Sequence, residues 1–118
     1  MSKLIVAVVE DIFFASKIRE TAQSLGVRAL FVRDRDQLVK SLEDKPDLIL
    51  VDLHNRKVDA IQVAEISKSR DDLEVIPLIG FFSHVETERQ RQALAAGYDR
   101  VIPRSVFSRD LANILQGR

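Results

Sequence analysis

Three runs of consecutive apolar residues divide the chain, at residues 4–9, 48–51 and 75–82. They do not alternate between apolar and polar positions, as a strand with one solvent-exposed face would. Continuous apolar runs are typical of central strands in a parallel sheet that is covered on both faces. Two weaker runs, 27–32 and 98–102, are interrupted by charged residues and indicate edge strands. The pattern therefore predicts five strands.

The segments between these runs show the apolar spacing of helices, and glycine or proline often marks their ends. Five helices are predicted: 14–25 before Gly26, 38–42 before Pro46, 58–64, 84–96 before Gly97, and a last one capped by Ser108, with Leu111, Ile114 and Leu115 facing inward. Strand and helix thus alternate five times with short connections. Parallel strands with right-handed helical crossovers follow, and helices cover both faces of the sheet. We expect one α/β domain over residues 1–118.

Composition narrows the function classes. The 118 residues contain 18 basic and 18 acidic side chains, so the formal net charge is zero and gives no reason to expect nucleic acid or an anionic membrane as partner. The absence of cysteine removes disulfides, thiolate metal sites and cysteine nucleophiles. The first apolar run is too short for a signal-peptide core or a membrane span. We therefore expect a cytoplasmic protein.

Three carboxylates follow two of the central strands: Glu10 and Asp11 after the first, and Asp52 after the third. Ligands of open parallel sheets bind beyond the carboxyl ends of the strands, so these residues are the candidate site. The first loop has no glycine, which argues against a dinucleotide site or a P-loop.

Carboxylates that converge need neutralisation, by a raised pKa, a hard divalent cation such as Mg²⁺, or a basic residue, for which Arg104 is the candidate. The alternative is that the acids are strand-end and cap residues that meet solvent separately. The residues alone leave both interpretations open.

Four segments in order resemble the signatures of the response-regulator receiver family: residues 8–11, 47–53, 76–79 and 93–99. The resemblance covers essentially the whole chain at nearly the family's spacing. It implies a doubly wound, flavodoxin-like fold with strand order 2-1-3-4-5 in three α/β/α layers. It also implies a signalling domain rather than an enzyme, with a histidine kinase or another signalling protein as partner.

The resemblance also assigns roles at the site. Asp52 falls on the phosphoacceptor position, and Glu10 and Asp11 fall on the acidic pair that positions Mg²⁺, with Asp11 and Asp52 as direct ligands. His54 falls where the family supplies a backbone carbonyl to the metal. The implied chemistry is attack of the Asp52 carboxylate on a phosphoryl group.

Several positions depart from the family pattern. Phe82 stands where the family has threonine or serine, and Val101 stands at the switch aromatic. Arg104 replaces the usual lysine, and Ser105 the proline that follows it. Ser83 substitutes for the missing hydroxyl only if the strand bulges. Phe82 either fills the space of the switch or points down into the core near Phe81 or Phe107.

Two functions remain. The first is an atypical receiver that accepts phosphate at Asp52 from a phosphorelay but has a degenerate switch. The second is a pseudo-receiver that acts as a protein-interaction module without phosphorylation. A hydrolase or phosphatase using the same acids is disfavoured, because the chain offers no dedicated base. The sequence does not identify the kinase, the output partner or the oligomeric state.

Overall fold

The computed structural model describes residues 3–83 and 86–117. The strands are β1 (Leu4–Val8), β2 (Arg28–Phe31), β3 (Leu48–Asp52), β4 (Leu78–Phe82) and β5 (Arg100–Pro103). The helices are α1 (Ile12–Leu25), α2 (Arg35–Leu42), α3 (Ala60–Ser67), α4 (Asp71–Glu74), α5 (Thr87–Ala96), α6 (Arg104–Arg109) and α7 (Leu111–Leu115).

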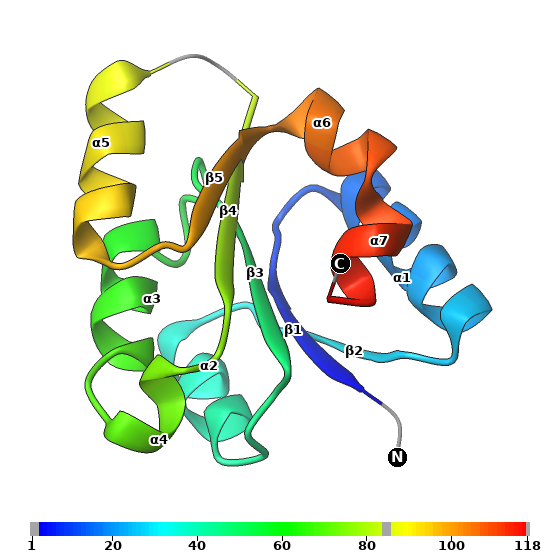
Figure 1. The fold of residues 1–118 in the computed structure, drawn as a ribbon, viewed down its shortest axis with the longest axis horizontal. Coiled ribbons are helices and arrows are strands. Elements are labelled where there is room, and N and C mark those ends of the chain that lie inside the picture. The colour runs from blue at the N-terminus through cyan, green and yellow to red at the C-terminus, as the bar shows by residue number, and fades with distance from the viewer. Residues whose placement is uncertain (1–2, 84–85, 118) are drawn as a thin grey trace.

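The five strands form one parallel sheet in the order β2-β1-β3-β4-β5, which confirms the expected topology. Helices α2, α3, α4 and α5 lie on one side of the sheet, and α1, α6 and α7 lie on the other (Figure 1). The carboxyl ends of the strands meet at the upper edge in this view. The layers match the expected α/β/α arrangement.

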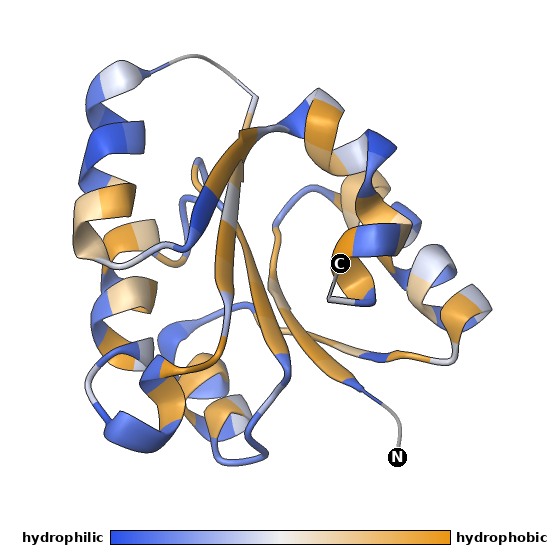
Figure 2. Ribbon diagram, viewed as in Figure 1, coloured by the Kyte–Doolittle hydropathy of each residue, from blue (hydrophilic) through white to orange (hydrophobic). Residues whose placement is uncertain are grey.

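Each side of the sheet has its own apolar core. Along β1, Val6 and Val8 join the core beneath α2, α3 and α5, which we call the α3-side core. Ile5 and Ala7 join the core beneath α1, α6 and α7, the α1-side core. Every residue of β1 is buried, as the continuous apolar run predicts, and the central strands are mostly apolar in Figure 2. The edge strands β2 and β5 contain exposed residues.

The helices differ from the prediction at the C-terminus. Helix α6 was not predicted, and the predicted last helix corresponds to α7. Asp110 separates the two with non-helical dihedral angles (φ −100°, ψ 12°), and its carboxylate accepts hydrogen bonds from Arg109. Ser108 lies inside α6 and is not a cap; its hydroxyl oxygen accepts a hydrogen bond from Lys17. The predicted inward face of Leu111, Ile114 and Leu115 is confirmed as buried.

Two other helices also depart from expectation. Helix α5 begins at Thr87, and His84, where the prediction began, lies outside the described residues. Helix α4 was not predicted, because its four residues contain three acids and one buried apolar side chain, Leu73. Such a short segment has no apolar stripe to read.

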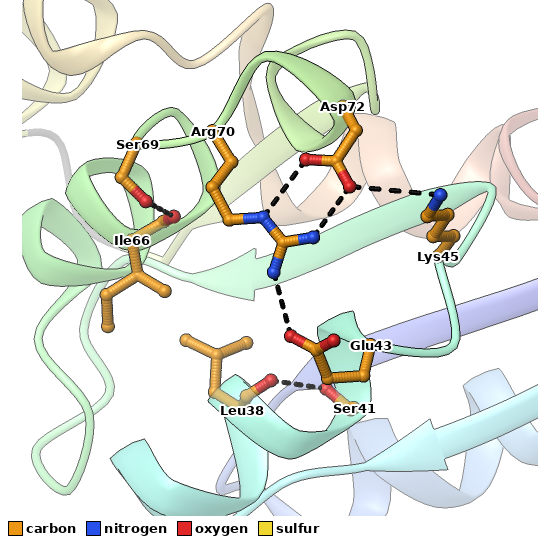
Figure 3. Close-up of polar contacts among 8 residues, drawn as sticks. All are labelled: Leu38, Ser41, Glu43, Lys45, Ile66, Ser69, Arg70 and Asp72. Carbon is orange, nitrogen blue, oxygen red and sulfur yellow. Dashed lines mark hydrogen bonds and ion pairs between the residues drawn. The ribbon is translucent and has the colours of Figure 1, made fainter.

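The opposite edge of the sheet, at the amino ends of the strands, carries a network of charged side chains (Figure 3). The Arg70 guanidinium donates two hydrogen bonds to Asp72, of 3.0 and 2.7 Å, and one of 2.8 Å to Glu43. Lys45 Nζ lies 3.8 Å from the same Asp72 carboxylate. These contacts fasten the connection before β3 to the start of α4. We assign the network a structural role, since it lies far from the strand ends that hold the candidate site.

Candidate functional site

Asp11 ends the β1 loop and begins helix α1. Its Oδ1 accepts the backbone N–H groups of Phe13 (2.9 Å) and Phe14 (3.1 Å), so the carboxylate is the N-cap of the helix. Its other oxygen, Oδ2, accepts a hydrogen bond of 2.8 Å from Arg104 Nη2. The capping bond from Phe14 and the Arg104 guanidinium hold the pKa of Asp11 below its usual value.

Arg104 begins helix α6, directly after β5, and its guanidinium lies over the ring of Phe14 at 4.4 Å from the ring centroid. The ring is buried and stacks on Phe81. Arg104 therefore has an anionic partner on one side and an aromatic surface on the other, a combination that suits the planar guanidinium. The structure shows Arg104 to be the basic partner expected at the acidic site.

Asp52 is the last residue of β3 and is half-buried. Its Oδ1 accepts the backbone N–H of His54 at 2.9 Å. Burial raises the pKa of Asp52, and this effect exceeds the opposing influence of the His54 amide. The His54 imidazole Nδ1 lies 3.8 Å from a Glu86 carboxylate oxygen. The expected role of the His54 carbonyl as a metal ligand stays a prediction.

A pH dependence of stability follows from the raised pKa of Asp52. An acid with a raised pKa in the folded state stabilises the fold at pH values below the unfolded pKa, and that contribution is lost as the pH rises through the folded pKa. We therefore expect Asp52→Asn, which has no charge to bury, to be more stable than the wild type at neutral pH. The difference should vanish at pH values where both side chains are neutral. Urea unfolding at the two pH values measures this, and a less stable Asp52→Asn protein at neutral pH would contradict it.

Glu10 has a different basic partner from Asp11. Its carboxylate is 3.9 Å from Arg56 Nε. It also lines a hollow of about 320 Å³ that is shared with Arg33 and Lys57. The groove beside Arg104 is a different one, lined by other residues. Adjacent residues of the loop thus present their carboxylates to different basic partners.

The arrangement does not fit a divalent cation as it stands. Both oxygens of Asp11 have donors, and Glu10 lines a separate hollow beside Arg56. Within residues 3–83 and 86–117, no group of three or more His, Asp or Glu side chains is placed to hold a metal ion. Mg²⁺ needs near-ideal octahedral geometry and surrenders its waters reluctantly. Asp11 would have to leave Arg104 to serve as a ligand.

Phe82, at the end of β4, is 9% exposed and belongs to the α3-side core. Val101 on β5 packs against the same core. Phe81 and Phe107, by contrast, lie in the α1-side core. The expectation that a core position of Phe82 would bring it near these two rings is wrong, because neighbouring residues of a strand point to opposite faces. An apolar cluster containing Phe82 and Val101 stands where the family's hydroxyl and switch aromatic are expected.

Strand β4 pairs with β5 residue by residue up to Phe82 and Pro103. Ser83 follows the strand and is exposed. It lines a groove of about 490 Å³ on the α1 side, with Phe13, Phe14, Lys17, Arg104, Ser105 and Ser108. The regular pairing shows no bulge that would bring Ser83 to the Phe82 position. The fold therefore does not favour the prediction that the Ser83 hydroxyl replaces the missing one.

Two site residues escaped the sequence reasoning. The contact of Phe14 with Arg104 was not predicted, because nothing in the apolar spacing of residues 14–25 signals that Arg104, ninety positions later, lies on the Phe14 ring. Arg56 was not predicted to be a site residue, yet its Nε lies 3.9 Å from the Glu10 carboxylate. An aspartate directly before a helix often caps it. The sequence could therefore have predicted that one oxygen of Asp11 accepts backbone N–H groups at the start of α1.

Sequence and structure comparisons place the chain among known proteins. No protein-family model matches it. Over 102 residues it is 32% identical to the response regulator protein VraR of Staphylococcus epidermidis, a match that covers 86% of this chain and 47% of the relative. The chain spans less than half the length of the curated relatives that it matches.

Solved structures share the whole fold. The chemotaxis response regulator CheY4 of Vibrio cholerae has a TM-score of 0.84 at 17% identity, and the match covers 99% of this chain and 98% of that one. The receiver domain of a sensor histidine kinase of Pseudomonas aeruginosa, crystallised with magnesium in its active-site cleft, has a TM-score of 0.83 at 23% identity, with coverages of 99% and 97%. No helix in the described part of the chain is long and apolar enough to cross a membrane.

Proposed function

We propose that this chain, a receiver domain of the response-regulator type in its fold and sequence similarity, works in two-component signalling as an interaction module without a phosphate-driven switch. The observation that carries the proposal is the position of Phe82 in the α3-side core with Val101 packed against that core. A phenyl ring has no hydroxyl that can hydrogen-bond an acyl phosphate. The Phe82 ring also offers no polar atom that could draw the following loop inward.

An exposed apolar pair supports association with a protein. Ile12 and Phe13, at the start of α1, are 77% and 86% exposed. Large apolar side chains side by side on a surface are typical of contact sites. Receiver domains interact with histidine kinases and other signalling proteins, and we propose a partner of this class. They are signalling domains rather than classical enzymes, and we propose no turnover of a substrate for this chain. Neither nucleic acid nor a membrane is proposed as a partner.

A second candidate function is phosphorylation of Asp52. It is favoured by the position of the carboxylate at the end of β3, half-buried beside the strand-end loops. Mg²⁺ would be its cofactor by similarity to the magnesium-bound neighbour. That metal stays a prediction, because Asp11 in this structure is held by Arg104.

One experiment separates the two functions. The protein is incubated with acetyl phosphate and Mg²⁺, and then with beryllium fluoride as a phosphoryl mimic, while mass and amide chemical shifts are recorded. We expect no mimic-dependent shifts at Phe82, Val101 or along α5, because this apolar cluster has no polar contact to make with the mimic. Asp52→Asn is the control for both readings.

The outcomes are distinct. A single phosphoryl mass shift that Asp52→Asn abolishes would establish the second function. Mimic-dependent shifts that spread through β5 and α5 and vanish in Asp52→Asn would overturn the proposed function. Phe82→Thr, which restores a hydroxyl at the strand end, is expected to gain such shifts if Asp52 accepts the mimic.

A further inference from the structure

The acidic site already contains its own cation. Arg104 Nη2 lies 2.8 Å from Asp11 Oδ2, and Asp11 Oδ1 is occupied by the two amides at the start of α1. The carboxylate is thus satisfied from both sides by groups of the same chain. A metal ion at this carboxylate would have to remove a hydrogen-bonded guanidinium before it could bind.

The position of Arg104 is fixed by more than this ion pair. Its guanidinium lies on the ring of Phe14, which is buried and stacks on Phe81 at 4.8 Å between ring centroids. Phe81 in turn stacks on Phe107 of α6, the helix that Arg104 begins. The surface beneath the guanidinium is therefore a set of three packed rings, and the helix that carries Arg104 contributes one of them.

Neither Glu10 nor Asp52 replaces Asp11 as a metal ligand. Glu10 lies beside Arg56 and lines a different hollow, and Asp52 accepts a hydrogen bond from the His54 amide. A guanidinium is also more weakly hydrated than an ammonium group, whereas Mg²⁺ loses its waters reluctantly. Neutralisation of Asp11 by Arg104 requires neither the dehydration of a metal ion nor a rearrangement of the loop.

We propose that Arg104 is the permanent counterion of Asp11 and takes the place of a divalent cation, so that this receiver domain neutralises its acidic site without metal. The inference goes beyond the proposed function, because it concerns the metal and not the switch.

The test is binding of Mn²⁺, the spectroscopic substitute for Mg²⁺, followed by electron paramagnetic resonance. Arg104→Met removes the charge and keeps an apolar stem on the Phe14 ring. We expect this variant to bind Mn²⁺ at least about tenfold more tightly than the wild type, which corresponds to about 1.4 kcal/mol. Adding Asp11→Asn to Arg104→Met should abolish the gain, since the released carboxylate is the ligand.

Arg109→Ala is the matched control. Arg109 is an exposed arginine of the same helix, paired with Asp110 and not with the site. Its removal changes the net charge equally and should leave Mn²⁺ binding as in the wild type. Wild-type protein that binds Mn²⁺ as tightly as Arg104→Met, or a gain that survives Asp11→Asn, would overturn the inference.

A second measurement does not depend on Mn²⁺. A ligand that binds only the folded state raises the melting temperature. Addition of about 10 mM Mg²⁺ should leave the melting temperature of the wild type unchanged and raise that of Arg104→Met. If Arg104→Met folds poorly, Arg104→Gln serves in its place, and a wild-type melting temperature that rises with Mg²⁺ still contradicts the inference.

Discussion

Replacing Phe81 by alanine will lower the free energy of unfolding by about 3–5 kcal/mol, the usual cost of removing a buried aromatic side chain. Phe81 is 1% exposed, and its ring stacks on those of Phe14 and Phe107 at centroid distances of 4.8 and 4.5 Å, in a three-ring cluster in which Phe14 and Phe107 also lie 5.4 Å apart. The substitution leaves a cavity between β4, α1 and α6 that the surrounding helices only partly close. Equilibrium unfolding in urea measures the loss.

Phe13→Ala is the control for this substitution. Phe13 is the same kind of residue on the same helix as Phe14, but it is 86% exposed. Its removal should change the free energy of unfolding by no more than about 0.5 kcal/mol. The cavity of Phe81→Ala also loosens the surface under Arg104, so the hydrogen bond to Asp11 should weaken with it. A loss below about 1 kcal/mol for Phe81→Ala would show that the three rings are not the support of α1 and α6.

Gly80→Ala is expected to cost about 1–3 kcal/mol through overpacking. A Cβ atom at this position of β4 would lie 2.7 Å from Leu53 Cδ2 and 3.1 Å from the Tyr98 ring. Leu53 is fully buried, and the Tyr98 hydroxyl donates a hydrogen bond of 2.8 Å to the Ala60 carbonyl oxygen. Neither side chain can move away without losing a buried contact.

The cause can be isolated by a double-mutant cycle. Leu53→Ala removes the atom that a new Cβ would meet, so Gly80→Ala should cost less in that background than in the wild type. Urea unfolding of the four proteins gives the coupling. If the cost is the same in both backgrounds, the close approach of Leu53 is not its cause.

The fold was predictable because the apolar runs are strong and local. The run at residues 48–51 alone identifies a central strand, and Gly26 and Gly97 do end helices α1 and α5. Helix α6 was missed because Ser108, which lies inside it, was interpreted as the cap of the last helix. Helix α4 was missed because its single buried side chain, Leu73, makes no periodic pattern.

At the site, the sequence identified residues but not their directions. The acidic pair of Glu10 and Asp11 reads as one unit, yet successive residues of a loop can face different partners. Here they face Arg56 and Arg104. The contact of Arg104 with Phe14 joins residues from opposite ends of the chain, and only the folded sheet brings them together. The phosphoacceptor role of Asp52 stays a prediction drawn from the resemblance.

The two cores on opposite sides of the sheet have a consequence for how this domain can diverge. Phe82 and Val101 belong to one core, while Phe14, Phe81 and Phe107 belong to the other, and the backbone of the sheet separates them. Substitutions that share no contacts are nearly additive in free energy. The family's threonine and switch aromatic, at the positions of Phe82 and Val101, can therefore be replaced without a compensating change in the rings that support Arg104 on the other face. In this fold, the response to phosphorylation and the neutralisation of the acidic site can therefore change independently of each other.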